Sequence, residues 1–232
     1  MIFNFKHFSI EQSNAVLKVG TDAFVLGAFM EATSPKSVLD IGSGTGVLSL
    51  IAAQKFNRAH IDAVEIDEES AQLANLNFTN SKWKERLHIH HTALQDYKSH
   101  ATYDLIVSNP PFFENSSAAD SDVNNRVKHN NGLSAEELIS NVAELLSDSG
   151  ICWLILSADF MTTYLKAIKH HQLYITKEIN VFGKPSVLKR KILVLEKEEK
   201  EKQYQDFTIR NMDGKYSAEY IALTKELHDR AL

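Results

Sequence analysis

The segment Asp40-Ile41-Gly42-Ser43-Gly44-Thr45-Gly46 is the first place where residue types and their spacing could do chemistry. Three glycines at alternate positions permit unusual backbone dihedrals and let a ligand approach the main chain closely. A dinucleotide fingerprint would need glycine where Val47 stands, and the Gly-Lys-Ser/Thr of a phosphate-binding Walker loop is absent. Asp40 offers a carboxylate to an ammonium group or a ribose, and the following helix N-terminus favours a ligand carboxylate. The turn therefore indicates a binding site for a small ligand other than a dinucleotide.

A second acid, Glu65, is expected at the end of the next strand. A carboxylate has two oxygens that only accept hydrogen bonds, so it can hold both hydroxyls of a ribose. The alternative is that Glu65 and Asp67 merely cap the helix that begins near residue 68. We expect capping for Asp67 and ligand binding for Glu65.

The tetrapeptide Asn109-Pro110-Pro111-Phe112 directly follows an apolar run. Two prolines there force a rigid extended turn, which fixes the directions of the Asn109 side-chain oxygen and the Pro110 carbonyl. An amino group on adenine or on an amide is a poor nucleophile because its lone pair is delocalised. Two acceptors aimed at its hydrogens would expose that lone pair, with each hydrogen bond contributing roughly 1.5–3 kcal/mol.

Phe112 presents a flat ring beside these acceptors, and stacking on a base contributes roughly 1–3 kcal/mol. A target base would have to leave its stack, which costs least in a single-stranded loop. The alternative is a proline-rich loop in which Asn109 is only a turn former.

The elements that must position these residues are predicted from apolar runs alternating with amphipathic stretches. Strands are expected at 37–41, 61–66, 87–91, 103–108, 151–156, 173–182 and 191–196, the last two as antiparallel neighbours. Helices are expected at 23–30, 46–55, 68–79, 133–146 and about 159–170, with Ser134 and Glu137 as a capping box. This order predicts an α/β doubly wound sheet, in which ligands bind at the carboxyl ends of the strands. The chemistry-bearing residues fall there.

The composition of the chain limits which class of protein it can be. The chain has 232 residues, 44% hydrophobic and 24% charged, which predicts one soluble domain without repeats or linkers. The single cysteine, Cys152, lies in an apolar run and is expected to be a core thiol. Because no apolar run is long enough to span a membrane and no signal peptide is visible, we expect a cytoplasmic protein. A net charge of −5 does not favour nucleic-acid binding, so local patches must supply any phosphate contacts.

Two motifs carry a resemblance to known enzymes. The spacing from Asp40 to Gly46 resembles the first motif of class I methyltransferases, and Asn109 to Phe112 resembles the Asn/Asp-Pro-Pro-Tyr/Phe motif of amino-nitrogen methyltransferases. The resemblance implies a Rossmann-like fold, S-adenosylmethionine as cofactor, and catalytic roles for Asn109, Pro110, Pro111 and Phe112. It implies cofactor contacts at Asp40, Gly42, Ser43, Gly44, Thr45, Gly46, Glu65, Ile66 and Asn109.

The resemblance is incomplete after the third strand. Such enzymes often carry an Asp there that contacts the cofactor's adenine, whereas this chain has Thr92-Ala93-Leu94-Gln95-Asp96. The backbone of Ala93 or Leu94 could serve instead, or Asp96 could reach back. Asp96 equally well only caps a turn.

The ends of the chain narrow the resemblance further. The segments 18–29, beginning Lys18-Val19-Gly20-Thr21-Asp22, and 216–224 look like signatures of the bacterial tRNA1(Val) adenine N6-methyltransferase family. That family modifies adenine 37, beside the anticodon, which implies a tRNA partner. It also implies that Lys18, Thr21 and Asp22 close over the cofactor. Alternatively, these residues only form a turn at Gly20 and cap the N-terminus of the helix 23–30.

From this resemblance we divide the chain into an N-terminal cofactor-covering segment 1–36, a core 37–198 and a C-terminal extension 199–232. RNA contacts are expected from two cationic segments, residues 114–131 and 184–191. An equal alternative is that these charges are only solvated at the surface. Their candidate residues are Arg126, Lys128, Lys184, Lys189 and Arg190.

Two other functions remain open. A protein glutamine-amide methyltransferase would share Asn109 to Phe112, but such proteins carry a substantial helical domain before the glycine turn, and only 36 residues precede Ser37 here. A non-catalytic cofactor- or RNA-binding module would not need that intact motif. A metal site at His88 and His90, which would share one strand face, is not expected because no third ligand has suitable spacing.

Overall fold

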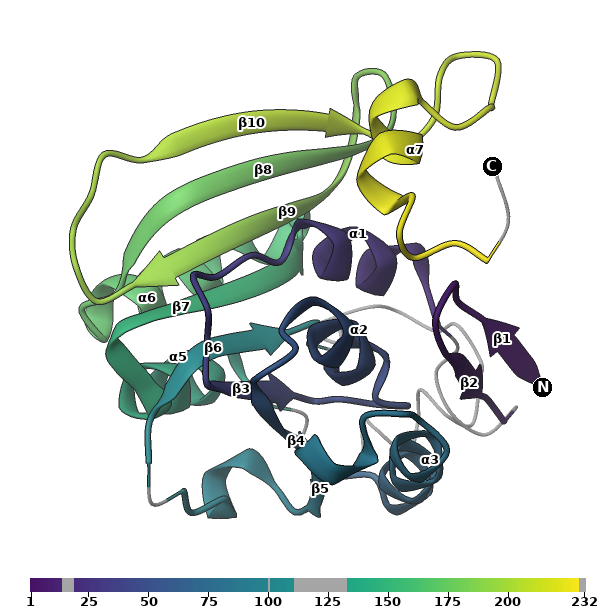
Figure 1. The fold of residues 1–232 in the computed structure, drawn as a ribbon. Helices are drawn as coiled ribbons and strands as arrows, with labels where there is room; N and C mark the ends of the chain where they lie inside the picture. The colour runs from purple at the N-terminus through teal and green to yellow at the C-terminus, as the bar shows by residue number, and fades with distance from the viewer. Residues whose placement is uncertain (14–18, 100, 111–132, 230–232) are drawn as a thin grey trace, which may run out of the picture.

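The computed structural model describes residues 1–13, 19–99, 101–110 and 133–229. Its centre is an eight-stranded sheet with the order β10-β8-β9-β7-β6-β3-β4-β5 (Figure 1). The strands are β3 (Ser37–Ile41), β4 (His60–Glu65), β5 (Leu87–His91), β6 (Tyr103–Ser108), β7 (Leu146–Ser157), β8 (Tyr174–Lys184), β9 (Val187–Glu196) and β10 (Gln203–Thr208). β9 runs antiparallel to β7 and β8, and the other neighbouring pairs are parallel. The expected α/β doubly wound sheet is confirmed.

Helices cover both faces of this sheet. They are α1 (Thr21–Phe29), α2 (Val47–Lys55), α3 (Glu68–Thr79), α5 (Ala135–Leu145), α6 (Met161–His170) and α7 (Ala218–Thr224). Alternate residues of each strand belong to two separate hydrophobic cores, one on each face of the sheet. Val38 and Val107 pack on the face covered by α1, α2, α3 and α7, whereas Leu39 and Ile106 pack on the face covered by α5 and α6. A strand period of two therefore places one half of each apolar run on either face.

Local signals explain several helix starts. The Asp67 side chain accepts a hydrogen bond from the Ser70 amide at 2.9 Å and so caps α3, as expected. The expected capping box of Ser134 and Glu137 is present at α5. The side-chain cap that is the alternative role for Thr21 and Asp22 is absent: α1 already begins at Thr21, its N-cap residue is Gly20, and no side chain caps it.

The strand predictions missed or shortened several elements. A hairpin of β1 (Ile2–Asn4) and β2 (Ser9–Glu11) precedes the sheet, and β10 was not expected because its exposed sequence lacks an apolar run. β7 begins at Leu146, which pairs with Tyr103 before the ladder resumes at Ile151 and Leu105. Lys184, Lys189 and Arg190 lie between the strands expected at 173–182 and 191–196, but in the structure they belong to longer strands, with only Pro185 and Ser186 between β8 and β9.

The two ends of the described chain are joined. Phe5 forms an isolated bridge with His228, and the Lys6 amide donates to the Leu227 carbonyl at 3.0 Å. The Lys6 ammonium also pairs with Glu226 at 2.8 Å. The β1–β2 hairpin and the segment after α7 therefore lie side by side at one edge of the molecule (Figure 1).

Cys152 is fully buried in β7, and burial raises the pKa of its thiol, in agreement with a core role. In the described part of the chain, no helix combines the length and apolar character required to cross a bilayer.

Candidate active site

The strand register brings the candidate residues to one edge of the sheet. β6, β3 and β4 are parallel neighbours, and Ile41 at the end of β3 lies level with Val64 and Ser108. The glycine turn, Glu65 and Asn109 therefore follow three adjacent strand ends, because the carboxyl ends of parallel strands share one edge. This is the convergence that the sequence predicted.

The glycine turn needs glycine for conformation and for space. Gly42, Gly44 and Gly46 have φ values of 69°, 54° and 80°, in the left-handed region that side chains disfavour. A Cβ at Gly46 would lie 2.4 Å from Cε1 of Phe78, so α3 packs directly against the turn. Gly46 is also the N-cap of α2, whose first amides point toward the turn.

Asn77 of α3 holds this turn in place. Its side-chain amide donates to the Thr45 carbonyl at 2.9 Å and to the Glu11 carbonyl at 3.2 Å, and its oxygen accepts from the Glu11 amide at 2.7 Å. Asn77 is buried and so links the glycine turn to β2. Sequence reasoning missed this residue, since a polar side chain on a helix carries no signal that it faces a loop.

Asp40 is a fully buried carboxylate with one oxygen satisfied. Its Oδ2 accepts from the Ser49 amide at 3.0 Å and from the Ser49 hydroxyl at 2.7 Å. Its Oδ1 is buried and has no partner among the described residues. Burial raises the pKa of Asp40 to about 7, against the opposing effect of the Ser49 hydrogen bonds. A cationic ligand group beside it would stabilise the charged form.

Glu65 holds the glycine turn through its side chain. Its Oε2 accepts from the Gly44 amide at 2.8 Å, and its Oε1 accepts from the Asp67 amide at 2.9 Å. Burial raises the pKa of Glu65, and these two hydrogen bonds limit the rise. Each carboxylate oxygen has two lone pairs, so one on each remains for a ribose hydroxyl. The bond to Gly44 was not expected.

Asn109 and Pro110 follow β6 directly. Oδ1 of Asn109 is buried without a partner among the described residues, and Pro110 is buried. The preceding residue, Ser108, fixes the strand end through a hydrogen bond from its hydroxyl to the Ile41 carbonyl at 2.8 Å. The other two residues predicted to be catalytic, Pro111 and Phe112, lie outside the described residues.

The unpartnered atoms fit the expected cofactor. Oδ1 of Asp40, Oγ of Ser43 and Oδ1 of Asn109 are buried polar atoms without a described partner at this edge. An unpaired buried polar atom is costly, so such a group calls for a ligand that offers hydrogen-bond donors. S-adenosylmethionine offers an ammonium group and ribose hydroxyls, which are donors. The residues present therefore fit this cofactor.

Among the described residues, the other predicted cofactor contacts in the core follow the ends of β3, β4 and β5. Thr45 is buried, and Ile66, directly after Glu65, is an apolar residue that is 45% exposed, where a flat ring could pack. Ala93 precedes a short 3₁₀ helix, Leu94–Asp96, and Leu94 is buried. Lys18 lies outside the described residues.

At the start of α1, the structure pairs two residues that were assigned to different partners. Nε of Arg190, on β9, donates to Oδ2 of Asp22 at 2.7 Å. Thr21 is the first residue of the same helix. Arg190 therefore ties β9 to the segment expected to cover the cofactor. Lys184 and Lys189 are exposed near the β8–β9 turn, and Arg126 and Lys128 lie outside the described residues.

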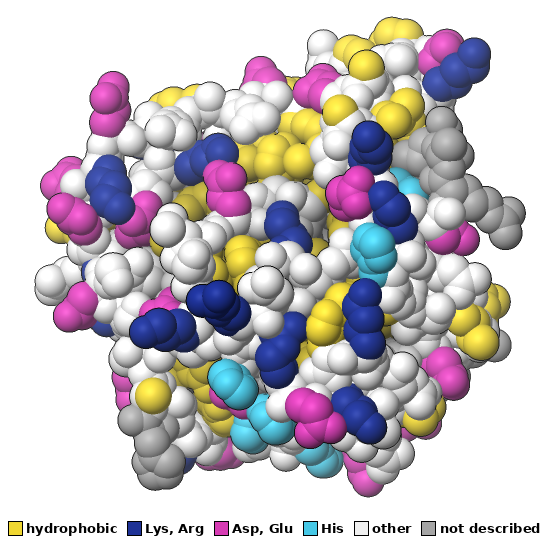
Figure 2. All heavy atoms as spheres, viewed as in Figure 1, with side chains coloured by type: hydrophobic (Ala, Val, Ile, Leu, Met, Phe, Trp, Pro, Cys, Tyr) yellow, Lys and Arg dark blue, Asp and Glu magenta, His cyan; other side chains and the backbone are white. Residues whose placement is uncertain are grey.

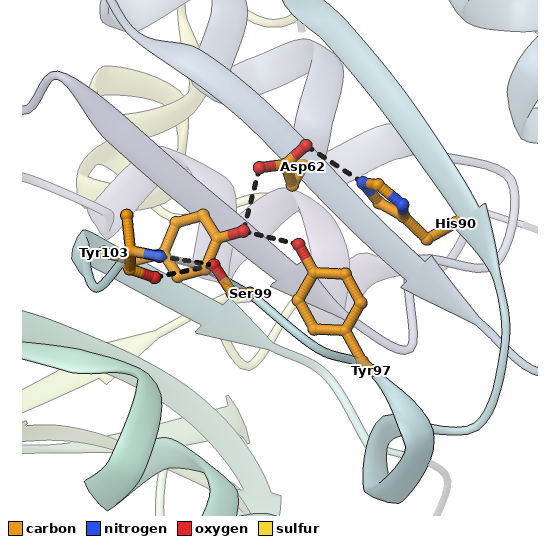
Figure 3. A network of polar contacts seen from close by, with 6 residues as sticks. Asp62, His90, Tyr97, Ser99 and Tyr103 are labelled. Atoms are coloured by element: carbon orange, nitrogen blue, oxygen red, sulfur yellow. Dashed lines mark hydrogen bonds and ion pairs between the residues drawn. The ribbon is translucent and has the colours of Figure 1, made fainter.

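His90 takes part in a polar network below this edge (Figure 3). Its Nε2 lies 3.0 Å from Oδ1 of Asp62, whose Oδ2 accepts from the Tyr103 hydroxyl at 2.8 Å; the Tyr97 hydroxyl lies 2.5 Å from that of Tyr103. The partners of His90 are thus protein groups. Within the described ranges, the one cluster with metal-ligand spacing is elsewhere: it consists of Glu136 on α5, His170 at the end of α6 and His171 directly after it.

The strand order, the glycine turn opening α2 and the unpartnered acceptors at the strand ends define a class I S-adenosylmethionine-dependent methyltransferase. A family model described as the methyltransferase small domain matches residues 10–177. The chain is 37% identical to a tRNA1(Val) (adenine(37)-N6)-methyltransferase of Cytophaga hutchinsonii, covering 97% of each chain. It is 35% identical to one of Shewanella baltica, covering 98% of this chain and 99% of that one. The chain therefore belongs to the tRNA1(Val) (adenine(37)-N6)-methyltransferase family.

Solved structures support the fold alone. A protein of Agrobacterium tumefaciens described as an O-methyltransferase superposes with a TM-score of 0.69 at 13% identity, covering 88% of this chain and 96% of that one. A protein of Listeria monocytogenes described as a class I methyltransferase gives a TM-score of 0.59 at 16% identity, covering 85% and 68%.

Proposed function

We propose that this protein transfers a methyl group from S-adenosylmethionine to N6 of adenine 37 in tRNA1(Val). The observation that carries the proposal is Oδ1 of Asn109, a buried acceptor without a partner among the described residues, at the strand end beside the glycine turn. The names of the relatives supply the substrate. Such a substrate implies action in the cytoplasm.

The residues at the strand ends are proposed to bind different parts of the cofactor. Asp40 and the amides opening α2 suit the oppositely charged ends of the cofactor's amino-acid tail, since a carboxylate attracts an ammonium group and a helix N-terminus attracts a carboxylate. Glu65 has lone pairs for the ribose. The cofactor supplies an electrophilic methyl carbon on a cationic sulfur. These contacts would present that carbon toward Asn109.

Asn109 then acts on the target nitrogen. Its Oδ1 and the Pro110 carbonyl accept hydrogen bonds from the two N6 hydrogens, which draws the nitrogen lone pair out of conjugation. That lone pair would take the methyl group that the bound cofactor supplies, with the electron pair of the broken C–S bond left on the sulfur, and the nitrogen would then release a proton to water. Because the developing positive charge sits on the held amino group, fixed acceptors stabilise the transition state more than the ground state. Phe112 is proposed to stack on the flipped base.

The test is mass spectrometry of total tRNA from cells with and without this gene product. Loss of one N6-methyladenosine, restored by the wild-type chain and not by Asn109→Ala, would support the proposal. The exposed Asn75 of α3 provides a matched control, since Asn75→Ala should restore the modification fully.

Two outcomes would contradict the proposal. If tRNA modification were unchanged and a methylated protein glutamine were lost instead, the substrate would be a side-chain amide. If neither changed while purified chain still bound the cofactor, the chain would be a binding module.

A further inference from the structure

The β8–β9 hairpin projects beyond the strand ends that form the site. Ser108, the last residue of β6, lies level with Leu154 of β7, which lies level with Leu193 of β9. β9 begins at Val187, so at ~3.3 Å per residue the hairpin extends about 20 Å past the end of β6. The projection lies on the carboxyl edge, where a large substrate must approach.

A second projection stands beside the hairpin. After β10, the Ile209 amide donates to the Phe182 carbonyl at 2.8 Å and the Arg210 amide donates to the Gly183 carbonyl at 3.2 Å. The chain then makes a tight excursion that closes where Arg210 bridges Tyr216. We call residues 210–216 the C-terminal turn; it precedes α7 at the upper right of Figure 1.

Cations gather on these two projections although the chain as a whole carries a net charge of −5. Lys184 and Lys189 are exposed on the hairpin, Lys215 is exposed on the C-terminal turn, and Arg210 is partly exposed at its base. These four residues are the cationic rim. Figure 2 shows Lys or Arg beside Asp or Glu and hydrophobic side chains at the upper right, where the C-terminal turn lies. Arg190 is not included because it pairs with Asp22.

The C-terminal turn is built to hold its shape. The Arg210 guanidinium lies 4.1 Å from the centre of the Tyr216 ring, and its Nη1 donates to the Gly214 carbonyl at 2.7 Å. Tyr216 in turn stacks on Tyr220 of α7 with ring centres 4.6 Å apart. The acid in the turn, Asp213, accepts from the Lys215 amide at 3.0 Å and thus closes the turn. Ordering these groups before binding lowers the entropy cost of contact.

We propose that the cationic rim binds the phosphate backbone of the tRNA while the target adenine occupies the site. This inference rests on the proposed function and adds the C-terminal turn to the substrate-binding surface. Charge complementarity favours RNA, because every nucleotide carries a phosphate whereas the rest of this protein is acidic overall. The fixed Arg210 offers a planar set of donors suited to a phosphate. The overhang of about 20 Å lets the rim contact backbone away from the flipped base.

The experiment measures binding and transfer separately with the full chain. A fluorescein-labelled transcript of tRNA1(Val) is titrated at several KCl concentrations against wild type, Lys184→Ala and Lys215→Ala. The exposed Lys166 of α6, on the opposite face of the sheet, gives the matched control Lys166→Ala. Each rim variant should raise Kd several-fold and lower the slope of log K against log salt by about 0.7–0.9. The control should match wild type in Kd and salt slope. In the rim variants, the affinity for the cofactor should equal that of wild type, and kcat measured at saturating tRNA should do so as well, because only tRNA binding is weakened.

The outcomes separate the two proposals. If wild type methylates the transcript and both rim variants keep the wild-type Kd and salt slope, tRNA binding by the cationic rim is refuted and the proposed methyl transfer is supported. If wild type transfers no methyl group but binds the transcript in a way that depends on the rim residues, the proposed methyl transfer is refuted and tRNA binding by the rim is supported. If wild type does not bind the transcript, or if Lys166→Ala weakens binding equally, tRNA binding by the rim is refuted.

Discussion

Replacing Asp40 by Asn removes a carboxyl group whose burial makes folding depend on pH. In the folded chain the pKa of Asp40 is about 7, against an ordinary value of 3.8. The folded state therefore binds a proton more tightly than the unfolded state. The stability that this proton adds is complete at low pH and is lost as pH rises through about 7.

The magnitude follows from that shift. With one pKa unit equal to about 1.4 kcal/mol, the full linkage is about 4 kcal/mol, of which roughly 2–3 kcal/mol falls between pH 5 and pH 8. Other titrating groups, Glu65 among them, add slopes of their own. The difference between wild type and Asp40→Asn isolates the contribution of Asp40, because those groups are common to both.

The assay is urea unfolding of the cofactor-free chain at several pH values from 5 to 8. Asn keeps an acceptor for Ser49 but adds an amide donor to a buried site, so Asp40→Asn should be destabilised at low pH. That deficit should shrink by roughly 2–3 kcal/mol toward pH 8. The exposed Asp148 gives a control for loss of a surface acid, as Asp148→Asn. Parallel curves for wild type and Asp40→Asn would refute the buried-carboxyl reasoning.

The affinity for the cofactor gives a second measurement on the same variant. If Asp40 meets the ammonium group, wild-type affinity for S-adenosylmethionine should rise as pH increases through about 7, by up to about tenfold per unit below it. Calorimetry should detect proton release on binding near pH 6. For Asp40→Asn the affinity should be weaker and this pH dependence absent.

Three further predictions follow from the site. Asn109→Ala should lower kcat by roughly 10²-fold or more while calorimetric cofactor affinity changes little, and near-normal turnover would remove Asn109 from the chemistry. Glu65→Ala should weaken cofactor binding and, by freeing the Gly44 amide, should also lower the free energy of unfolding; unchanged affinity in calorimetry would place the ribose elsewhere. Asn77→Ala removes the partner of the buried Thr45 carbonyl and of the partly buried Glu11 backbone, so we expect a loss of about 1–3 kcal/mol in the free energy of unfolding by urea together with weaker cofactor binding. An effect on stability with cofactor affinity intact would make Asn77 purely structural.

The sequence alone was sufficient where the signal is local. Short apolar runs alternating with amphipathic stretches predicted the central strands, and the spacing from Asp40 to Gly46 predicted a ligand turn that opens a helix. Such patterns are readable because strand burial and left-handed turns depend on residues next to one another in the chain. Together with the parallel-strand rule, they also placed Glu65 and Asn109 at the same edge.

Short and polar elements escaped prediction. β1 and β2 have three residues each, and β10 is largely exposed, so none carries an apolar period. These segments become strands only because a neighbouring strand supplies hydrogen-bond partners. Sheet pairing between distant segments decides them.

Tertiary structure alone decided which polar groups meet. Asn77 reaches Thr45 and Glu11 through a helix–loop contact, and Asp22 meets Arg190 across 168 positions of sequence. Hydrogen-bond partners so far apart depend on how whole elements dock, which residue spacing does not encode. The sequence determined the chemistry available at the site, and the packing of α3, α1 and β9 around the turn determined how that chemistry is held in place.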